Sequence, residues 1–154
     1  MEESNNDQST QAGRIVVGID GSEGSVTALR AAHRIAGALG QRIVALACWD
    51  IPAIPDGYSQ IGRNEFEDRA KEDLERTLGK AFGDDRPKDL KAVVRYGSAR
   101  PLLIEASRDA DMLVLGRRGH GGFHGLHLGS VSSACVARAH CPVLVVHTTD
   151  TALG

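Results

Sequence analysis

The amino-acid sequence predicts an α/β fold, with one domain built on an open, doubly wound parallel sheet. Two observations carry this prediction. Short and nearly continuous apolar runs are typical of strands that are covered on both faces. Segments of helical period alternate with these runs, and strand–helix–strand connections within one sheet are right-handed. The length of 154 residues is that of a single domain with helices on both faces of one sheet.

Five apolar runs are the predicted strands. They are rich in Val, Ile, Leu and Ala, which must build the core because only 4% of the chain is aromatic. The predicted strands span residues 14–19, 42–48, 91–96, 111–115 and 142–146. The last of them begins at Pro142, which biases the preceding residue toward an extended conformation.

Four segments between the strands are the predicted helices, at residues 22–39, 63–82, 98–108 and 130–139. In the first helix, Ser22 is the expected N-cap and Gly40 the expected stop. The apolar stripe of this helix is Val26, Leu29, Ala32, Ala36 and Leu39. The stripe of the second helix is Phe66, Ala70, Leu74, Leu78 and Ala81. Residues 50–62 contain two prolines and are predicted to form a long loop at the carboxyl edge of the sheet.

The composition excludes several classes of protein. The apolar fraction of 42% is too high for a disordered chain. No apolar run approaches the roughly 20 residues that a spanning helix needs, so a membrane is not an expected partner. The formal net charge of −2 gives no support for nucleic acid as a partner, because nucleic-acid-binding domains usually carry a basic surplus.

The chain divides into a tail, a domain and a second tail. Residues 1–13 are polar and lack the basic start and apolar stretch of a secretory signal, so we expect a disordered tail. Residues 14–147 form the predicted domain, and residues 148–154 a short polar tail. The cysteines, Cys48, Cys135 and Cys141, have no paired spacing, which indicates small buried side chains in a reducing cytoplasm.

Glycines gather after the fourth predicted strand. Six of the 18 glycines fall between Gly116 and Gly129, in the connection to the last helix. Open α/β sheets bind ligands at the carboxyl ends of their strands, and glycine lets the backbone approach a ligand closely. The helix that begins near Ser130 adds unpaired N–H groups and the positive end of its dipole. The segment therefore predicts an anion site, with phosphate as the expected occupant.

The spacing of these glycines is that of neither a P-loop nor a dinucleotide fingerprint. It reads Gly116-x₂-Gly119-x₉-Gly129-Ser130. Together with VGIDGS at residues 17–22, GSVS at residues 129–132 and CPVLVV at residues 141–146, this motif resembles the ATP-binding branch of the universal stress protein family. The resemblance covers nearly all of residues 14–147. It implies a Rossmann-like fold of the adenine nucleotide alpha hydrolase type, with strand order 3-2-1-4-5 and a nucleotide lying across the first and fourth strands.

The resemblance also implies which residues hold the phosphates. The backbone at Gly116, Gly119 and Gly129 would wrap the ribose and the phosphates. The hydroxyl and N–H of Ser130 and the N–H of Val131 would bind phosphate oxygens. Ser132 lies in the same first turn of the helix and would add a second hydroxyl.

The other end of the nucleotide is assigned in the same way. Asp20 would face the ribose, and backbone groups around Ala47 and Cys48 would read the adenine edge. Magnesium or manganese would be coordinated by the phosphates of ATP rather than by a set of protein ligands. Asp20 has a second interpretation, because Asp-Gly-Ser is also turn chemistry at the entry to a helix.

Four further residues near the predicted site have two interpretations each. Arg117 and Arg118 suit phosphates by charge but are also ordinary exposed loop residues. Trp49 and Tyr58 could stack on adenine or simply cover the core.

The predicted activity is regulation through a bound nucleotide rather than turnover. No set of nucleophile, base and orienting group is readable in the sequence, so no catalytic residue is predicted. His120, His124 and His127 would need a helical loop to share a metal, and the glycines argue against one. Slow ATP hydrolysis or self-phosphorylation, with Asp20 as the candidate base, remains one alternative. A nucleotide-free adaptor of the same fold is another, and a flavin carrier would need a phosphate loop after the first strand.

The last predicted strand is apolar and uncharged, and such an edge invites pairing with another chain. In the family that the sequence resembles, this strand pairs antiparallel with its copy across a two-fold axis. We therefore expect a homodimer through Val143, Leu144, Val145 and Val146. The resemblance further implies a cytoplasmic sensor or regulator in the stress response.

Overall fold

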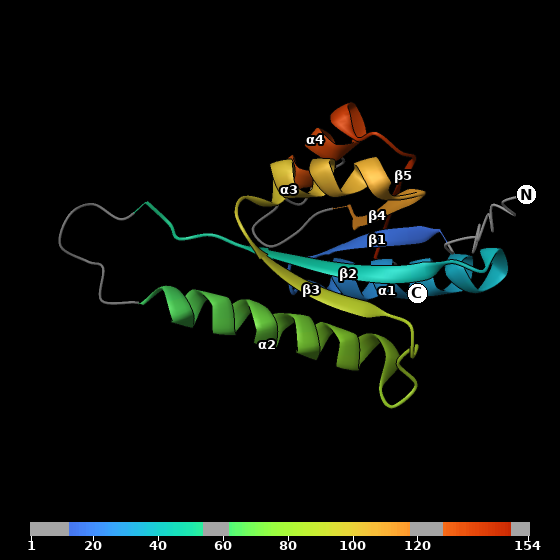
Figure 1. Cartoon of the computed structure of the whole chain (residues 1–154), viewed down its shortest axis with the longest axis horizontal. Coiled ribbons are helices and arrows are strands. Elements are labelled where there is room, and N and C mark those ends of the chain that lie inside the picture. Colours follow the sequence, from blue (N-terminus) through green and yellow to red (C-terminus); the bar gives the residue numbers. More distant parts are fainter. Residues whose placement is uncertain (1–12, 54–61, 118–127, 149–154) are drawn as a thin grey trace, which may run out of the picture.

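The computed structural model describes residues 13–53, 62–117 and 128–148, which form one five-stranded sheet between two layers of helices (Figure 1). Every neighbouring pair of strands is parallel, and the order is β3-β2-β1-β4-β5. The strands are β1 (Arg14–Ile19), β2 (Arg42–Trp49), β3 (Lys91–Tyr96), β4 (Met112–Gly116) and β5 (Val143–Val146). The helices are α1 (Glu23–Leu39), α2 (Arg63–Phe82), α3 (Ala99–Ala106) and α4 (Ser130–Arg138). The predicted fold class and strand order are confirmed.

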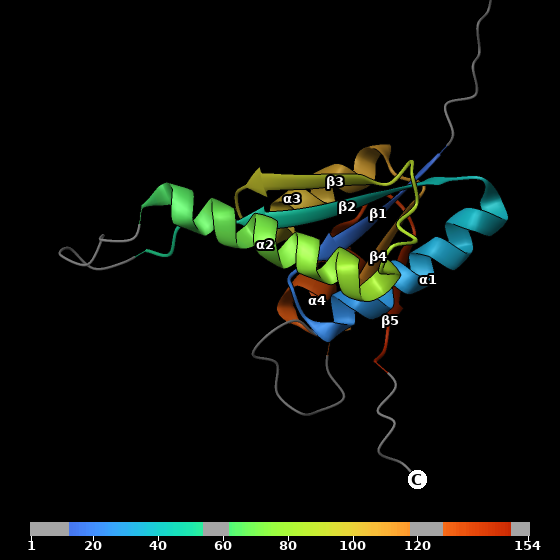
Figure 2. The same cartoon turned by 90° about the horizontal axis from the view of Figure 1, so that it is seen from below.

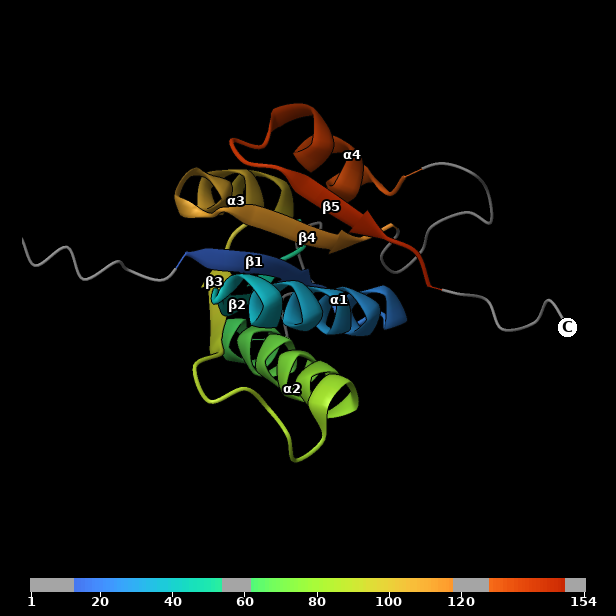
Figure 3. The same cartoon turned by 90° about the vertical axis from the view of Figure 1, so that its right-hand side faces the viewer.

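The helices divide between the two faces of the sheet. Helices α1 and α2 lie across one face, and α3 and α4 cover the other (Figures 2 and 3). Alternate side chains of β1 therefore enter two separate cores. Ile15 and Val17 pack beneath α1 and α2, whereas Val16 packs beneath α3 and α4. This double burial explains why the strands read as continuous apolar runs.

Helix α1 begins and ends as predicted, but one residue of its predicted apolar stripe is not buried. Ser22 is the N-cap of α1, and Gly40 ends the helix with a φ of +66°, which only glycine adopts freely. Leu39, predicted on the apolar stripe, is 60% exposed. The prediction was wrong there because Leu39 is the last residue of α1, where the chain turns away to enter β2.

The predicted third helix, at residues 98–108, is divided in the structure. Helix α3 ends at Ala106, and a short 3₁₀ turn, η1 (Ser107–Asp109), follows. Ser107 is fully buried and explains the break. Its hydroxyl donates to the Ile104 carbonyl and accepts the His140 N–H at 2.9 Å. These bonds tie the end of α3 to the segment that enters β5.

In the described ranges, 13–53, 62–117 and 128–148, no helix has both the length and the apolar character needed to cross a bilayer.

Shortening a core side chain of β4 should destabilise the fold. Leu113 is fully buried beneath α3 and α4, so Leu113→Ala leaves a cavity and should lower the free energy of unfolding by about 3 kcal/mol. Urea denaturation followed by circular dichroism measures the change. Val136→Ala, at a position that is 52% exposed on α4, is the control and should change stability by less than about 0.5 kcal/mol. Equal losses in the two variants would contradict the described core.

Candidate functional site

The central strands separate at their carboxyl ends. The last pair that joins β1 to β4 is Val17 with Val114. Beyond it, the end of β1 pairs only with β2, through Ile19 and Ala47, while the end of β4 pairs only with β5. This separation marks the point where strand order reverses, and such points are where open α/β sheets bind ligands.

Asp20 follows β1 and organises the start of α1. Its Oδ1 accepts hydrogen bonds from the Ser22 backbone N–H at 3.0 Å and from the Ser25 hydroxyl at 2.7 Å. The Ser22 hydroxyl donates to the same oxygen, and the Asp20 N–H donates to the Ser25 hydroxyl. The turn role of Asp20 at the helix entry is confirmed. The network also holds its carboxylate at the edge where β1 and β4 separate.

Gly116 ends β4 against the first turn of α1. A Cβ at this position would lie 2.9 Å from the carbonyl carbon of Gly24, which is closer than real Cβ atoms come to backbone. The carbonyl oxygen of Gly116 accepts a hydrogen bond of 2.7 Å from the Ser132 hydroxyl in the first turn of α4. The end of β4 is therefore held between the N-terminal turns of two helices.

Helix α4 starts at the same edge of the sheet. Gly129 is its N-cap, and the Gly129 N–H donates to the Arg117 carbonyl at 2.9 Å. The first intrahelical bond runs from the Ser133 N–H to the Gly129 carbonyl. The N–H groups of Ser130 and Val131 therefore have no acceptor within the helix, and the positive end of the helix dipole lies beside them. Gly119 and Arg118 lie outside the described residues.

The contacts above bring the predicted segments together. Asp20 bonds to Ser25, the neighbour of Gly24, and Gly24 touches Gly116. Gly116 bonds in turn to Ser132 in the turn that Ser130 opens. One edge of the sheet thus carries a carboxylate, a close backbone approach and the N-terminus of a helix. This combination suits a ligand with both hydroxyl groups and anionic oxygens.

Ala47 and Cys48 lie one strand away, in β2. Ala47 is buried and stands opposite Ile19 of β1 and Val94 of β3. Cys48 points to the other face, beneath α3 and α4. Burial raises the pKa of the Cys48 thiol to about 11, although the nearby Arg95 charge acts in the opposite direction. The thiol is therefore a packing group at neutral pH.

An aromatic cluster lies at the carboxyl ends of β2 and β3. Trp49 is only 8% exposed and meets Tyr96 of β3 edge to face, with ring centroids 4.8 Å apart. The Arg63 guanidinium, at the start of α2, lies 4.7 Å from the Tyr96 ring centroid and 5.6 Å from that of Trp49. Sequence reasoning missed Tyr96 and Arg63, because it is the register of β2 with β3 that pairs Trp49 with Tyr96. Tyr58 lies outside the described residues.

The described residues offer no cluster of metal ligands. No group of three or more His, Cys, Asp or Glu side chains that could hold a metal ion occurs in the part of the chain that the structure describes. The loop histidines His120, His124 and His127 lie outside it. The cysteines Cys48, Cys135 and Cys141 are free thiols.

Comparison with known proteins decides the family. The model of the universal stress protein family matches residues 12–147, which include every strand and helix of the fold. The chain belongs to the universal stress protein family.

Curated relatives and solved structures agree with this assignment. The universal stress protein Rv1996 of Mycobacterium tuberculosis is 37% identical over 139 residues, which are 85% of this chain and 43% of that protein. The chain thus spans less than half the length of this curated relative. A crystal structure of a universal stress protein in complex with cAMP is 26% identical, with a TM-score of 0.64 over 88% of this chain and 96% of that one. The universal stress protein of Archaeoglobus fulgidus in complex with dAMP is 18% identical, with a TM-score of 0.63 over 88% of this chain and 98% of that one.

The close approach at Gly116 predicts a position that tolerates no side chain. In Gly116→Ala, the new methyl group meets the Gly24 backbone, which cannot rotate away, so we expect a loss of about 1–3 kcal/mol of stability. Urea denaturation measures it. Gly37→Ala is the matched control, because nothing lies within 4 Å of its added Cβ and alanine favours the α1 helix by up to about 1 kcal/mol. A Gly116→Ala variant as stable as the parent would contradict the described packing.

The raised pKa of Cys48 predicts slow alkylation at neutral pH. The thiolate is the reacting form, so iodoacetamide labelling of Cys48 should stay slow at pH 8 and accelerate toward pH 11. Because the pKa of Cys48 in the folded protein lies above its ordinary value of 9.0, the buried thiol stabilises the fold below pH 9, and this contribution is lost as the pH rises to about 11. Peptide mass spectrometry follows the labelling site, and the urea-unfolded chain is the control. Rapid labelling of folded Cys48 at pH 8 would contradict the burial.

Proposed function

We propose that this universal stress protein domain binds an adenine nucleotide, with ATP as its ligand, and acts as a nucleotide-dependent regulator in the stress response. The observation that carries the proposal is the start of α4 at the reversal point of the sheet. There, the N–H groups of Ser130 and Val131 lack helical acceptors, and Asp20 stands at the end of the neighbouring strand. The cAMP complex of a protein 26% identical to this one supports the choice of an adenine nucleotide.

The phosphates of the nucleotide would bind at the first turn of α4. Ser130 is exposed, and its hydroxyl and N–H, together with the Val131 N–H, are donors that suit phosphate oxygens. The Ser132 hydroxyl already donates to the Gly116 carbonyl, so we assign this residue the task of holding α4 against β4. The backbone at Gly129 and Gly119 would pass beside the phosphates, and Arg117 would add positive charge.

The sugar and base would extend from α4 across the ends of β1 and β2. Asp20 is suited to accept hydrogen bonds from ribose hydroxyls, and the backbone around Ala47 and Cys48 offers polar groups for the adenine edge. Magnesium or manganese, held by phosphate oxygens, would offset the negative charge of ATP. The buried Trp49 is better placed to support this edge than to stack on the base.

The proposed regulator would work as a homodimer through β5. The carbonyls of Pro142 and Val146 accept bonds from the β4 side, so the alternate residues Val143 and Val145 turn their backbone groups to the free edge. All four residues of β5 are half-buried, and its side chains are uncharged. An edge of this kind invites an antiparallel copy. Three free thiols fit a reducing compartment, and we propose the cytoplasm.

Nucleotide affinity tests the proposed phosphate site. Ser130→Ala removes one donor to a charged group and should weaken ATP binding about tenfold, as measured by isothermal titration calorimetry with magnesium present. Ser133→Ala, one residue beyond the first turn, is the matched control and should bind like the parent. The larger change Gly129→Glu places a carboxylate beside the phosphates and should abolish measurable binding. An unaltered affinity in Gly129→Glu would overturn the assignment, as would a parent protein that takes up no ATP.

The oligomeric state tests the proposed interface. Val145→Pro removes an N–H that faces the free edge and leaves the bonds to β4 in place, so it should convert the dimer to a monomer. Val145→Thr keeps the N–H and the shape and is the control. Analytical ultracentrifugation at micromolar concentration separates the two states. A monomeric parent, or a Val145→Pro variant that remains dimeric, would exclude β5 as the contact.

A further inference from the structure

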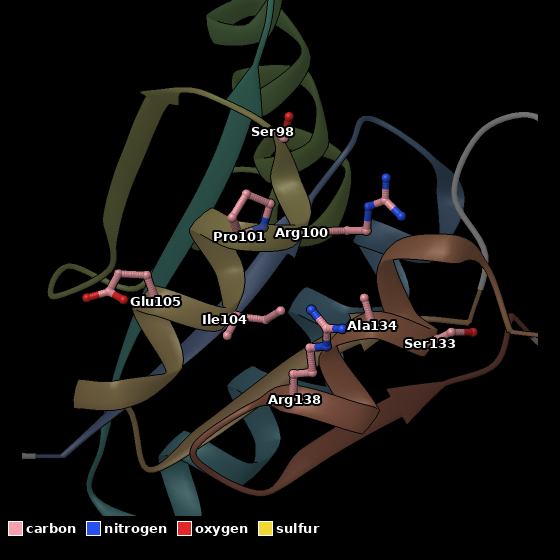
Figure 4. Close-up of a pocket in the computed structure, with 8 residues that line it drawn as sticks. All are labelled: Ser98, Arg100, Pro101, Ile104, Glu105, Ser133, Ala134 and Arg138. Carbon is pink, nitrogen blue, oxygen red and sulfur yellow. The ribbon is translucent and has the colours of Figure 1, made fainter.

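A second surface feature lies on the far side of the sheet from α1 and α2. The space between α3 and α4 forms an open groove of about 800 Å³ (Figure 4). Its lining comes from these two helices and the residue that caps α3: Ser98, Arg100, Pro101, Ile104, Glu105, Ser133, Ala134 and Arg138. None of them is among the residues assigned above to the nucleotide.

The middle of the groove is apolar. Ile104 of α3 faces Ala134 of α4, and Figure 4 shows both side chains turned toward the gap between the helices. Ile104 and Ala134 are only partly buried by the fold itself. An aliphatic side chain from outside would complete their burial, which is favourable because it removes apolar surface from water.

Two arginines line the groove. Arg100 extends from α3 toward the first turns of α4, and Arg138 extends from α4 toward α3 (Figure 4). Glu105 points away from the gap and is paired with Arg108 at 3.1 Å. Within the ranges that the structure describes, neither Arg100 nor Arg138 makes an ion pair with a carboxylate. Two guanidinium groups that share one groove repel each other, and carboxylates from a ligand would relieve the repulsion.

We propose that the α3–α4 groove docks an acidic segment of a partner protein, in which an aliphatic side chain is flanked by carboxylates. The aliphatic side chain would cover Ile104 and Ala134, and the carboxylates would pair with Arg100 and Arg138. Guanidinium groups bind carboxylates with two parallel hydrogen bonds, which fixes the direction of the segment as well as its charge. The proposal goes beyond the proposed nucleotide function and does not depend on it.

The charge and shape of the groove favour a peptide over nucleic acid. Affinity for nucleic acid comes from many phosphate contacts, whereas this groove offers two arginines beside a small apolar surface. The chain as a whole carries a formal net charge of −2, which disfavours a polyanion. An acidic peptide with an apolar residue matches both the arginines and the apolar surface beside them.

Fluorescence polarisation with a labelled model peptide tests the proposal. The probe is a fluorescein-labelled peptide in which a leucine stands between two pairs of glutamates, and the protein is the full chain without nucleotide. We expect saturable binding that weakens as salt is added, because exposed ion pairs are screened. Arg138→Glu and Arg100→Glu should each weaken binding at least about tenfold. Arg34→Glu, an exposed arginine on the opposite face in α1, should leave it unchanged.

Control peptides and NMR mapping of the binding site distinguish an acidic peptide from other ligands of the groove. A peptide with alanine in place of leucine should bind several-fold more weakly, and one with lysines in place of glutamates should not bind. In ¹H–¹⁵N spectra, the glutamate peptide should shift the amides of Arg100, Ile104 and Ala134, with the thermal melting of each variant confirming its fold. The proposal is overturned if these amides do not shift, or if Arg138→Glu binds like the parent. Tighter binding of a labelled oligonucleotide at the groove, or a change in self-association in Arg138→Glu, would also overturn it.

Discussion

The packing of Gly116 against Gly24 is the contact on which the candidate site depends. It holds the end of β4 against the first turn of α1, at the point where β1 and β4 stop pairing. The Ser132 hydroxyl then joins the first turn of α4 to the same carbonyl group. A side chain at Gly116 would separate these elements. The start of α4 would no longer stand beside Asp20, and the edge would lose the arrangement that suits a nucleotide.

The two faces of the sheet have different tasks in this arrangement. Helix α1 follows β1 directly, and its first turn, organised by Asp20 and Ser25, forms one wall of the site. Helix α4 contributes to both proposed sites. Its first turn lies at the proposed phosphate site, and its later residues line the groove shared with α3. The proposed nucleotide and the proposed partner would therefore bind at opposite ends of the same nine-residue helix.

Much of the fold could be predicted because it rests on local patterns. Continuous apolar runs and helical stripes located every strand and helix, with end points that differ by a few residues. The differences have physical causes in contacts distant along the chain. Ser107 breaks the third predicted helix because it accepts a bond from His140, and Leu39 is exposed because α1 ends there. The pairing of Arg63 with Trp49 and Tyr96 joins three elements, and no local pattern indicates it.

By itself, the sequence determined the α/β class, the order of elements along the chain and the glycine-rich connection that ends at Ser130. These follow from residue type and spacing, which act over a few residues. Only the tertiary structure decided that Ser132 donates to Gly116 and that Arg100 and Arg138 share one groove. The physical reason is that a hydrogen bond or a shared surface depends on the positions of two groups in space. Those positions are set by how the helices pack on the sheet.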